Sequence, residues 1–590
     1  MDIVIVAGLV IAVATAVPVI LQLRHHPRGL RILFFAEMWE RFSYYGMRGL
    51  LIFYLTQHFL FDDTAAAGEY GAYTSLVYLC PVIGGLLADR FLGARKAVAF
   101  GALLLVLGHL TMAIEGEPST QVLTYKNAAY NFQVIGRGEA RNVKLLVGGQ
   151  AYGYAASTDG GLDIKALPAT APLPAHIAKS DYKISVAKQD PLFKNILFVA
   201  LALIIVGVGF LKANISAIVG QLYPESDPRR DPGFTLYYYG INLGSFLASI
   251  TCGWLGQTVG WWAGFGAAGV GMALGWLVFV LGKPMLEGKG EPPDPVALAK
   301  PVAGPLNTEW LIYLGGIVGV GVIWVVVQSF AIVSVLLGIG AVCVLAYLVW
   351  YMIVVAEKVE RDRLILAIVL ILASVVFWAL YEQGGSSLNL FAERNVDLHL
   401  YGDQAMKPAQ AQSFQSGWIL ILAPAMAALW TWLGRSRRDP NPVAKFGAGL
   451  LLIGASYYVL ILGGKFAGPD FKAPLIFLAG AYLMQTTGEM CVSPVGLSQM
   501  TKLAPPLLIS TLMATWFLGT AGAQFVAAKI AQLTASDTIG GQVLDAGKAL
   551  ATYGHVFGVI GLWGLGAGGV MLVISPWLKK LAHGAGGVAD

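Results

Sequence analysis

Long apolar runs recur along almost the whole sequence, and they constrain the fold more than any other feature. A helix needs roughly 20 consecutive, mainly apolar residues to cross the hydrocarbon core of a bilayer. About fifteen stretches meet this requirement, and they lie at 3–23, 30–59, 69–91, 96–114, 191–220, 231–257, 260–282, 308–328, 330–355, 362–388, 414–434, 443–464, 473–500, 507–533 and 551–580. Only 12% of the residues are charged, about half the share in a typical soluble domain. The sequence therefore predicts a polytopic membrane protein.

The pattern within these runs distinguishes the two structures that can span a membrane. Backbone polar groups must be satisfied internally in lipid, which leaves helix bundles and closed barrels. The runs are continuous and rich in leucine, valine, alanine and glycine, without the period-two alternation of barrel strands. We therefore predict an all-α membrane protein embedded in a lipid bilayer. No basic tract indicates a nucleic-acid partner.

Basic residues gather in loops on one side of the predicted spans, and the positive-inside rule makes that side cytoplasmic. These loops lie at 24–31, 89–96, 223–232, 357–363, 434–440 and 578–580. The chain reaches its first arginine only at Arg24, whereas a secretory signal peptide begins with basic residues. We therefore expect a retained first helix with its N-terminus outside, and a cytoplasmic C-terminus.

Two stretches interrupt the helical pattern. Residues 115–190 are polar, with short alternating runs and glycine-containing turns, which predicts a small strand-rich insertion on the outer face. Residues 283–307 are polar and proline-rich, as in a cytoplasmic linker between two halves of a bundle. The spans at 308–328 and 330–355 carry no charge between Trp310 and Val355, so we expect them to be accessory helices that face lipid.

Charged residues inside the predicted spans are the main candidates for function, and they are Glu37, Glu40, Arg41, Arg48, Lys212, Glu382 and Glu489. A charge at the bilayer centre costs about 2.5–3.5 kcal/mol on insertion scales, so such residues usually face a cavity or a partner. In "EMWERFSYYGMR" (37–48) the charges follow helical steps of three or four, which places them on one face. The proton affinity of a carboxylate changes when its arginine partner moves away and returns, and proton coupling requires such a change. A static ion-pair patch between two helices is the alternative interpretation.

The other intramembrane charges lie far away along the chain. Lys212 is too deep in its apolar run to reach the interface, and we expect it to pair with an acid. Glycine or proline residues follow both Glu382 and Glu489, which suits a bend or a local cavity. Tight helix packing is the alternative explanation for these glycines and prolines.

Several segments resemble the proton-dependent oligopeptide transporter family, a branch of the major facilitator superfamily. The matching segments are "EMWERFSYYG" (37–46), which fits the pattern ExxERFxYYG in full, "YYGINLGSF" (238–246), "FWALYEQGGSS" (377–387) and "GEMCVSPVGLSQMTKLAP" (488–505). "GGLLADRFLGARK" (84–96) resembles the superfamily loop between helices two and three, in which Asp89 and Arg90 would pair at a domain interface. The resemblance runs from about Leu30 to Leu581, interrupted by the insertion.

The resemblance implies a major facilitator superfamily fold of two six-helix bundles with two accessory helices between them. The implied parts are an extra N-terminal helix and basic linker (1–29), helices one to three (30–114), the insertion (115–190), helices four to six (191–282), the linker (283–307), the accessory pair (308–355), the C-terminal bundle (356–581) and a cytoplasmic tail (582–590).

The resemblance also implies proton-coupled symport of di- and tripeptides by alternating access across the bacterial inner membrane. The proton gradient would drive it without a cofactor or metal, in a monomer. The implied substrate-binding residues are Arg41, Tyr44, Tyr45, Arg48, Tyr78, Lys212, Asn242, Trp378, Glu382, Glu489 and Trp516. The implied proton-coupling residues are Glu37, Glu40, Arg41 and Glu382. Glu382 would exchange between Lys212 and Arg48 as a gate opens and closes.

The residues themselves fit a peptide substrate, because a zwitterion needs a cationic and an anionic end in one cavity. The first half supplies Arg41, Arg48 and Lys212, and the second supplies Glu382 and Glu489. The sequence departs from the family at 212–214, where "KAN" replaces "KPN", and at Tyr381, where relatives often carry an acid.

Three other functions are less compatible with the sequence than peptide transport. A family member that carries nitrate or another small solute is disfavoured by the two acids of the second half. A membrane peptidase is disfavoured because the sequence contains no HExxH or GxSxG, so we predict no enzyme. A receptor role suits the insertion but leaves the buried charges unexplained.

Overall fold

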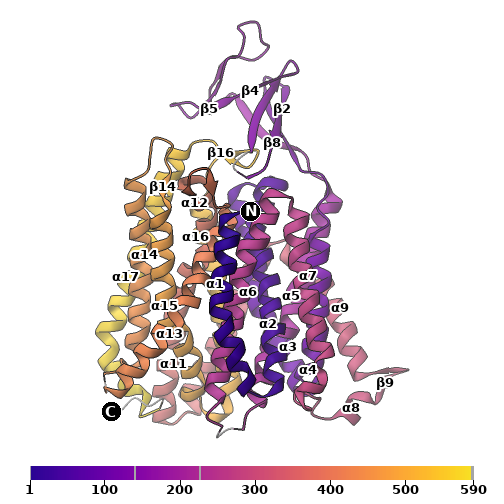
Figure 1. Cartoon of the computed structure of the whole chain (residues 1–590), viewed down its shortest axis with the longest axis vertical. Coiled ribbons are helices and arrows are strands. Elements are labelled where there is room, and N and C mark those ends of the chain that lie inside the picture. Colours follow the sequence, from indigo (N-terminus) through magenta and orange to yellow (C-terminus); the bar gives the residue numbers. More distant parts are fainter. Residues whose placement is uncertain (1, 139–140, 225–226, 437, 586–590) are drawn as a thin grey trace.

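The computed structural model describes the chain except residues 1, 139–140, 225–226, 437 and 586–590. Long helices run side by side, and a small domain of strands stands on one end of the bundle (Figure 1). We call the end that carries these strands the insertion side and the opposite end the far side. The chain begins on the insertion side and its C-terminal helix ends on the far side (Figure 1).

Fifteen long helices correspond one to one with the predicted spans in the described part of the chain. They are α1 Ile3–Gln22, α2 Arg28–Phe53, α3 Asp63–Leu87, α4 Ala94–Met112, α5 Pro191–Gln221, α6 Arg230–Thr258, α7 Trp261–Leu281, α9 Thr308–Val327, α10 Phe330–Val354, α11 Lys358–Tyr381, α13 Ser413–Arg435, α14 Pro442–Lys465, α15 Leu475–Leu503, α16 Ile509–Leu533 and α17 Ala546–Leu578. Thirteen of the described helices are long and apolar enough to cross a membrane. Helices α2 and α6 are not among the thirteen, because their polar side chains lower their mean hydropathy.

One predicted span is wrong in its extent. The span at 362–388 is divided, because α11 ends at Tyr381 and a single 3-10 turn, Glu382–Gly385, leads into the short helix α12, Ser387–Asn395. The break falls at two glycines, which weaken a helix. Gly385 is also required sterically, since a Cβ there would lie 1.9 Å from the hydroxyl oxygen of Tyr70.

Capping residues set where several helices begin. The Asp62 carboxylate accepts a 2.8 Å hydrogen bond from the backbone of α3, and Asp190 caps α5, whose first position is Pro191. Asn307 and Ser329 cap the accessory helices α9 and α10 in the same way. Each cap satisfies a backbone N–H group that has no partner inside its helix.

The long helices form two halves of six. In the first half α2 packs on α6 and α7, and α4 packs on α5; in the second half α14 packs on α15 and α17. The halves meet along two seams, one between α3 and α16 and the other between α6 and α13. The accessory helix α10 contacts both α3 and α16, whereas the extra helix α1 packs on α6.

The predicted strand-rich insertion is present on the insertion side (Figure 1). Its larger sheet is antiparallel with the order β4-β3-β2-β1-β8, formed by β1 Thr120–Tyr125, β2 Ala128–Ile135, β3 Asn142–Val147, β4 Gln150–Tyr152 and β8 Tyr182–Lys188. A smaller sheet contains β5 Tyr154–Ala156, β6 Leu162–Ile164 and β7 His176–Ile177. The insertion has a hydrophobic core of its own, separate from that of the helices.

Short elements occupy the remaining connections. The linker contains α8 Pro295–Ala299, β9 Pro301–Ala303 and β10 Leu306–Asn307. On the insertion side of the second half lie β11 Val396–Asp397, β12 His399–Tyr401, β13 Gln404–Ala405, β14 Ala473–Pro474, β15 Thr538–Ile539 and β16 Gln542–Val543. The last two form a hairpin between α16 and α17 that approaches the insertion (Figure 1).

Candidate functional site

Helix α2 brings two acids and one arginine into contact. The Nε atom of Arg41 lies 2.8 Å from Glu37 Oε1 and 2.7 Å from Glu40 Oε2. All three side chains are buried. One guanidinium group therefore forms ion pairs with two carboxylates. Glu37 Oε2 and Glu40 Oε1 have no hydrogen-bond partner among the described residues, so each is an acceptor that a proton or a ligand can use.

A second ion pair joins the two halves. Nη2 of Arg48, on α2, donates to the carboxylate of Glu382, in the turn after α11. Nε of the same guanidinium donates to the hydroxyl oxygen of Tyr70 on α3 at 2.7 Å. The sequence predicted Arg48 and Glu382 as gate residues but missed Tyr70, because nothing in the sequence distinguishes it from Tyr73 on the same helix.

The predicted acid partner of Lys212 is not in contact with it in this conformation. The described residues offer no carboxylate oxygen within 4.0 Å of Nζ; instead Nζ lies 3.6 Å from the ring centroid of Tyr78. A cation over an aromatic face is attracted by the ring quadrupole.

Two tyrosine hydroxyl groups hold Glu489 on α15. Tyr381, at the end of α11, donates a hydrogen bond to Oε2, and Tyr238 on α6 reaches Oε1 at 3.4 Å. Asn242 does not contact the carboxylate directly among the described contacts but donates to the backbone oxygen of Tyr238 at 3.0 Å. The position at which relatives often carry an acid therefore supplies a hydrogen-bond donor here.

Aromatic residues surround these charges. The rings of Tyr44 and Tyr45 meet edge to face at 5.2 Å, and the guanidinium groups of Arg41 and Arg48 lie 5.7 and 5.9 Å from their respective centroids. Trp378 meets Tyr381 edge to face at 5.2 Å. The ring of Trp516 lies against Gly496 of α15, where a Cβ would come within 2.2 Å of it.

The two residues of the predicted interdomain loop lie outside this cluster. Asp89 and Arg90 are exposed at the far side, in the turn Ala88–Leu92. The guanidinium group of Arg90 lies 5.6 Å from the ring centroid of Phe91. Neither residue makes an ion pair in the described part of the chain, so the predicted pairing at a domain interface is not made in this conformation.

Polar contacts between the halves gather between mid-bundle and the insertion side. Arg394 of α12 makes a bidentate ion pair with Asp63 of α3. Gln57 donates to Glu393, and Asn389 donates to the backbone oxygen of Gly49 at 2.9 Å. Sequence reasoning missed this layer because Asp63 and Arg394 lie outside the predicted spans. The halves are therefore joined at the insertion side.

Opposite charges face each other across the interface of the two halves. Arg41, Arg48 and Lys212 come from α2 and α5, whereas Glu382 and Glu489 come from the turn after α11 and from α15. Two six-helix halves that meet at such a polar interface are the architecture of membrane transporters of the major facilitator superfamily, and the solved structures to which the chain is similar have this fold.

The family follows from comparison with known proteins. A family model described as "POT family" matches residues 95–545, which is more than half of the chain. The chain therefore belongs to the POT family, the proton-dependent oligopeptide transporters.

Individual relatives cover nearly the whole chain. An "uncharacterized transporter YclF" from Bacillus subtilis (strain 168) is 32% identical over 95% of this chain and 96% of its own length. A "di-/tripeptide transporter" from Lactococcus lactis subsp. cremoris is 31% identical over 94% of this chain and 96% of its own.

Two solved structures align along nearly their whole length. A peptide transporter POT in complex with alafosfalin has a TM-score of 0.70 and 32% identity, covering 94% of this chain and 96% of its own. A POT family transporter in complex with 5-aminolevulinic acid has a TM-score of 0.69 and 27% identity, covering 94% and 97%.

Proposed function

We propose that this protein is a proton-coupled symporter that imports di- and tripeptides across the bacterial inner membrane by alternating access. The carrying observation is the distribution of charge across the interface. Arg41, Arg48 and Lys212 lie on the first half, where Arg41 pairs with Glu37 and Glu40, and the acids Glu382 and Glu489 lie on the second half. A zwitterionic peptide can bridge the halves through its two ends. Anion transport is less compatible with Glu489, whose carboxylate lies at mid-bundle with hydroxyl partners only among the described hydrogen bonds.

Each end of the peptide has a candidate partner. Arg41 and Lys212 are the proposed partners of the peptide carboxylate, since both lie on the first half beside aromatic rings. Glu489 is the proposed partner of the amino group, with Asn242 nearby through Tyr238. The surrounding tyrosines and tryptophans accept varied side chains because aromatic surfaces impose little directional demand.

Proton coupling is assigned to the α2 cluster. Arg41 already bonds both acids, so a peptide carboxylate that draws Arg41 away would leave Glu37 and Glu40 without their cation. Loss of a nearby cation favours the protonated form of a carboxyl group. Substrate and proton binding are thereby linked through one side chain. Glu382 is the proposed gate residue, released from Arg48 when the insertion side opens.

The proposed orientation places the insertion in the periplasm and the far side in the cytoplasm. The basic loops identified in the sequence lie at the far side, in agreement with the positive-inside rule. The contacts that join the halves at the insertion side then correspond to a carrier closed to the periplasm. We further propose that one chain is the working unit, because both halves of the site come from a single chain.

The decisive test is transport in proteoliposomes. The purified protein is reconstituted, an inward proton gradient is imposed, and uptake of labelled dialanine is followed with and without a protonophore. We expect uptake above equilibrium that collapses with the protonophore. Glu357→Gln, at an exposed acid on the end of α11, is the matched control for acid variants. Absence of gradient-dependent uptake, or equal uptake of nitrate, would contradict the proposal.

A further inference from the structure

The insertion contacts both halves of the bundle at the same time. Its chain connections belong to the first half, because it lies between α4 and α5. It contacts the second half through the β15–β16 hairpin. This arrangement holds the two halves together on the insertion side.

The connections to the first half are short and hydrogen-bonded. Ser119 donates its backbone N–H to the backbone oxygen of His58 at 2.8 Å, and Gln189 donates to Phe59 at 3.0 Å. The Glu115 carboxylate accepts from the backbone N–H of Trp262 at 3.0 Å. Both ends of the insertion are therefore fixed to the ends of α2 and α7, and its base moves with the first half.

The insertion contacts the second half through a side chain of the hairpin, which packs into the hydrophobic core of the insertion. Ile539, in β15, is 1% exposed and belongs to the hydrophobic core of the insertion. The turn that presents it is Gly540-Gly541, with φ values of +58° and +78°, as two-residue hairpin turns of the primed types require. A Cβ at Gly540 would lie 2.8 Å from both Cγ atoms of Val143, so the turn lies directly against β3.

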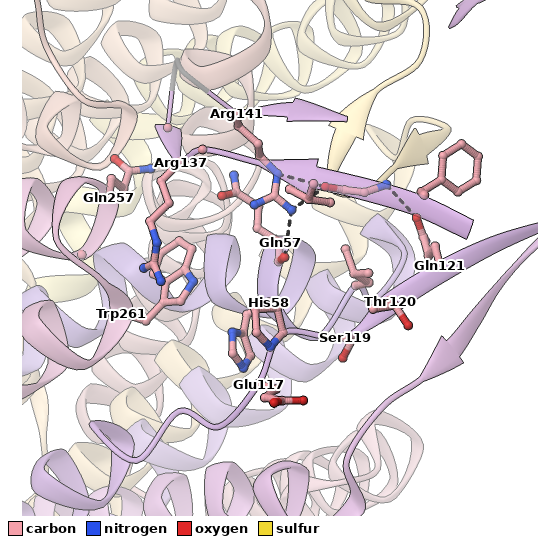
Figure 2. A pocket seen from close by; sticks show the side chains of 18 residues that line it. Gln57, His58, Glu117, Ser119, Thr120, Gln121, Arg137, Arg141, Gln257 and Trp261 are labelled. Atoms are coloured by element: carbon pink, nitrogen blue, oxygen red, sulfur yellow. Dashed lines mark hydrogen bonds between the residues drawn. The ribbon is translucent and has the colours of Figure 1, made fainter. Parts of the chain in front are cut away.

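Arg141 completes the bridge from the insertion. Its Nη2 donates to the backbone oxygen of Gln57 at 3.0 Å, and its Nε donates to the backbone oxygen of Gly540 at 3.0 Å (Figure 2). The side chain of Gln121 accepts from the backbone N–H of Gly540 at 2.6 Å (Figure 2). One guanidinium group thus joins the end of α2 to the α16–α17 hairpin.

The insertion and the β15–β16 hairpin do not meet along a continuous packed interface. A cavity of about 510 Å³ separates the base of the insertion from the bundle beside Arg141, and His58, Arg137 and Gln257 lie along its wall (Figure 2). An interface that depends on Ile539, the partly buried Leu544 and a few hydrogen bonds can separate and re-form without unfolding either partner. The hairpin itself retains its own strand pairing.

We propose that the insertion is a releasable latch, which holds the insertion side closed by binding the β15–β16 hairpin and must let it go for that side to open. The inference rests on the proposed alternating-access function. The hairpin moves with the second half and the base of the insertion moves with the first. Separation of the halves on this side therefore withdraws Ile539 from its pocket and breaks the hydrogen bonding of Arg141 to Gly540, whereas its bond to Gln57, within the first half, remains.

A reversible cross-link tests whether the insertion must release the hairpin for transport to occur. Lys179 of the insertion and Asp537 beside the hairpin form an exposed ion pair at 3.2 Å. Lys179→Cys and Asp537→Cys are combined, joined by a short bis-methanethiosulfonate, and assayed in the proteoliposome system. Uptake should fall at least about tenfold and return with dithiothreitol, while each single variant transports normally. Undiminished uptake by the cross-linked protein would overturn the latch.

A second measurement tests whether the contact between the insertion and the hairpin favours the conformation that is closed on the insertion side. Ser387, on α12, is 0% exposed, and Ser387→Cys reports opening through its rate of labelling by an impermeant maleimide. Ile539→Ser should raise that rate by roughly tenfold, since it removes one buried aliphatic side chain. Ile135→Ser, at a residue of β2 that is 51% exposed, is the matched control and should have no effect. An unchanged rate for Ile539→Ser would refute the proposal.

Failure of the latch and failure of the proposed function give different results. If the unmodified protein takes up no peptide, the transport proposal fails, and the labelling measurement still reports on the bridge. If uptake is normal but neither the cross-link nor Ile539→Ser has an effect, only the latch fails.

Discussion

Arg394 of α12 binds Asp63 of α3 through two hydrogen bonds, from Nη1 at 2.6 Å and Nη2 at 2.8 Å, with both side chains about 2% exposed. This pair connects the two halves directly beneath the insertion. The backbone N–H of Ser536 donates to the same carboxylate at 2.9 Å. A buried, bidentate ion pair of this kind imposes a specific alignment on the halves.

Asp63→Asn should destabilise the protein by about 3–5 kcal/mol, because it leaves the Arg394 guanidinium group buried without its counter-charge. Thermal unfolding in detergent is the measurement. Asp403→Asn, at an exposed aspartate in the turn between β12 and β13, is the control. Equal melting temperatures for the two variants would contradict the assigned role of the pair.

Glu37→Gln and Glu40→Gln should each abolish proton-driven uptake while leaving peptide exchange partly intact. Each change removes a titratable oxygen next to Arg41 but keeps the shape of the side chain. Exchange does not require net proton movement, so it isolates peptide binding and reorientation. Uphill uptake that survives both changes would show that the coupling acid lies elsewhere. Glu489→Ala should weaken exchange as well, since it removes the proposed partner of the peptide amino group.

Tyr381→Phe should raise the KM for peptide roughly fivefold with little change in the maximal exchange rate. The hydroxyl group of Tyr381 orients the Glu489 carboxylate, and a hydrogen bond to a charged group contributes on the order of 1 kcal/mol or more. Tyr458→Phe, which removes a 3.2 Å hydrogen bond to Gly558 away from the site, is the matched control. A reduced maximal rate at normal KM would assign Tyr381 to reorientation instead.

Gly385→Ala should disrupt the gate, because the added Cβ would lie 1.9 Å from the hydroxyl oxygen of Tyr70 and 3.1 Å from Nε of Arg48. Uptake and thermal stability should both fall. Gly384→Ala is the control, since its Cβ would meet nothing closer than 3.5 Å. Adding Tyr70→Phe to Gly385→Ala should restore part of the stability by removing the clashing atom. The absence of any rescue would place the defect in the backbone of the turn.

Glu291 should contribute a small pH-dependent stability to the linker. Hydrogen bonds from Arg95, at 2.7 and 3.0 Å, lower the pKa of the Glu291 carboxyl group. The contribution is therefore fully present above the unfolded pKa of about 4.3 and is lost as the pH falls through the lower folded pKa. At pH 7 Glu291→Gln should cost about 0.2–1 kcal/mol, as a partly exposed pair does.

The measurement for Glu291 is the difference in melting temperature between the variant and the unchanged protein from pH 7 down to pH 3. The difference should disappear at the acid end. Glu287→Gln, at an exposed position of the same linker, should show none at any pH. A difference for Glu291→Gln that persists at acid pH would mean that packing, not charge, holds this contact.

The sequence was sufficient for the architecture, because each apolar run of spanning length has to become a helix in lipid. It also located the intramembrane charges, whose rarity makes them conspicuous. It did not locate the partner of Lys212. Lys212 lies over Tyr78 and not against an acid, and local sequence carries no information on which of several nearby groups a long side chain meets.

Residues outside the predicted spans were missed for a related reason. The predicted span ends at residue 388, so Arg394 lies outside it, although Arg394 is buried on the short helix α12 that follows the break. Ile539 is an isoleucine in a short turn between two helices. No periodicity within that turn could indicate that its side chain completes the core of a domain hundreds of residues away.

The seven intramembrane charges have an electrical consequence. They comprise four acids and three cations, so the carrier with all of them ionised has one net negative charge within the membrane, and one bound proton neutralises it. Moving one elementary charge across 100 mV involves about 2.3 kcal/mol. In the proposed proton-coupled cycle and orientation, an inside-negative membrane potential therefore acts on the return of the empty carrier, which it drives toward the periplasm, and leaves the protonated, peptide-loaded step nearly independent of voltage.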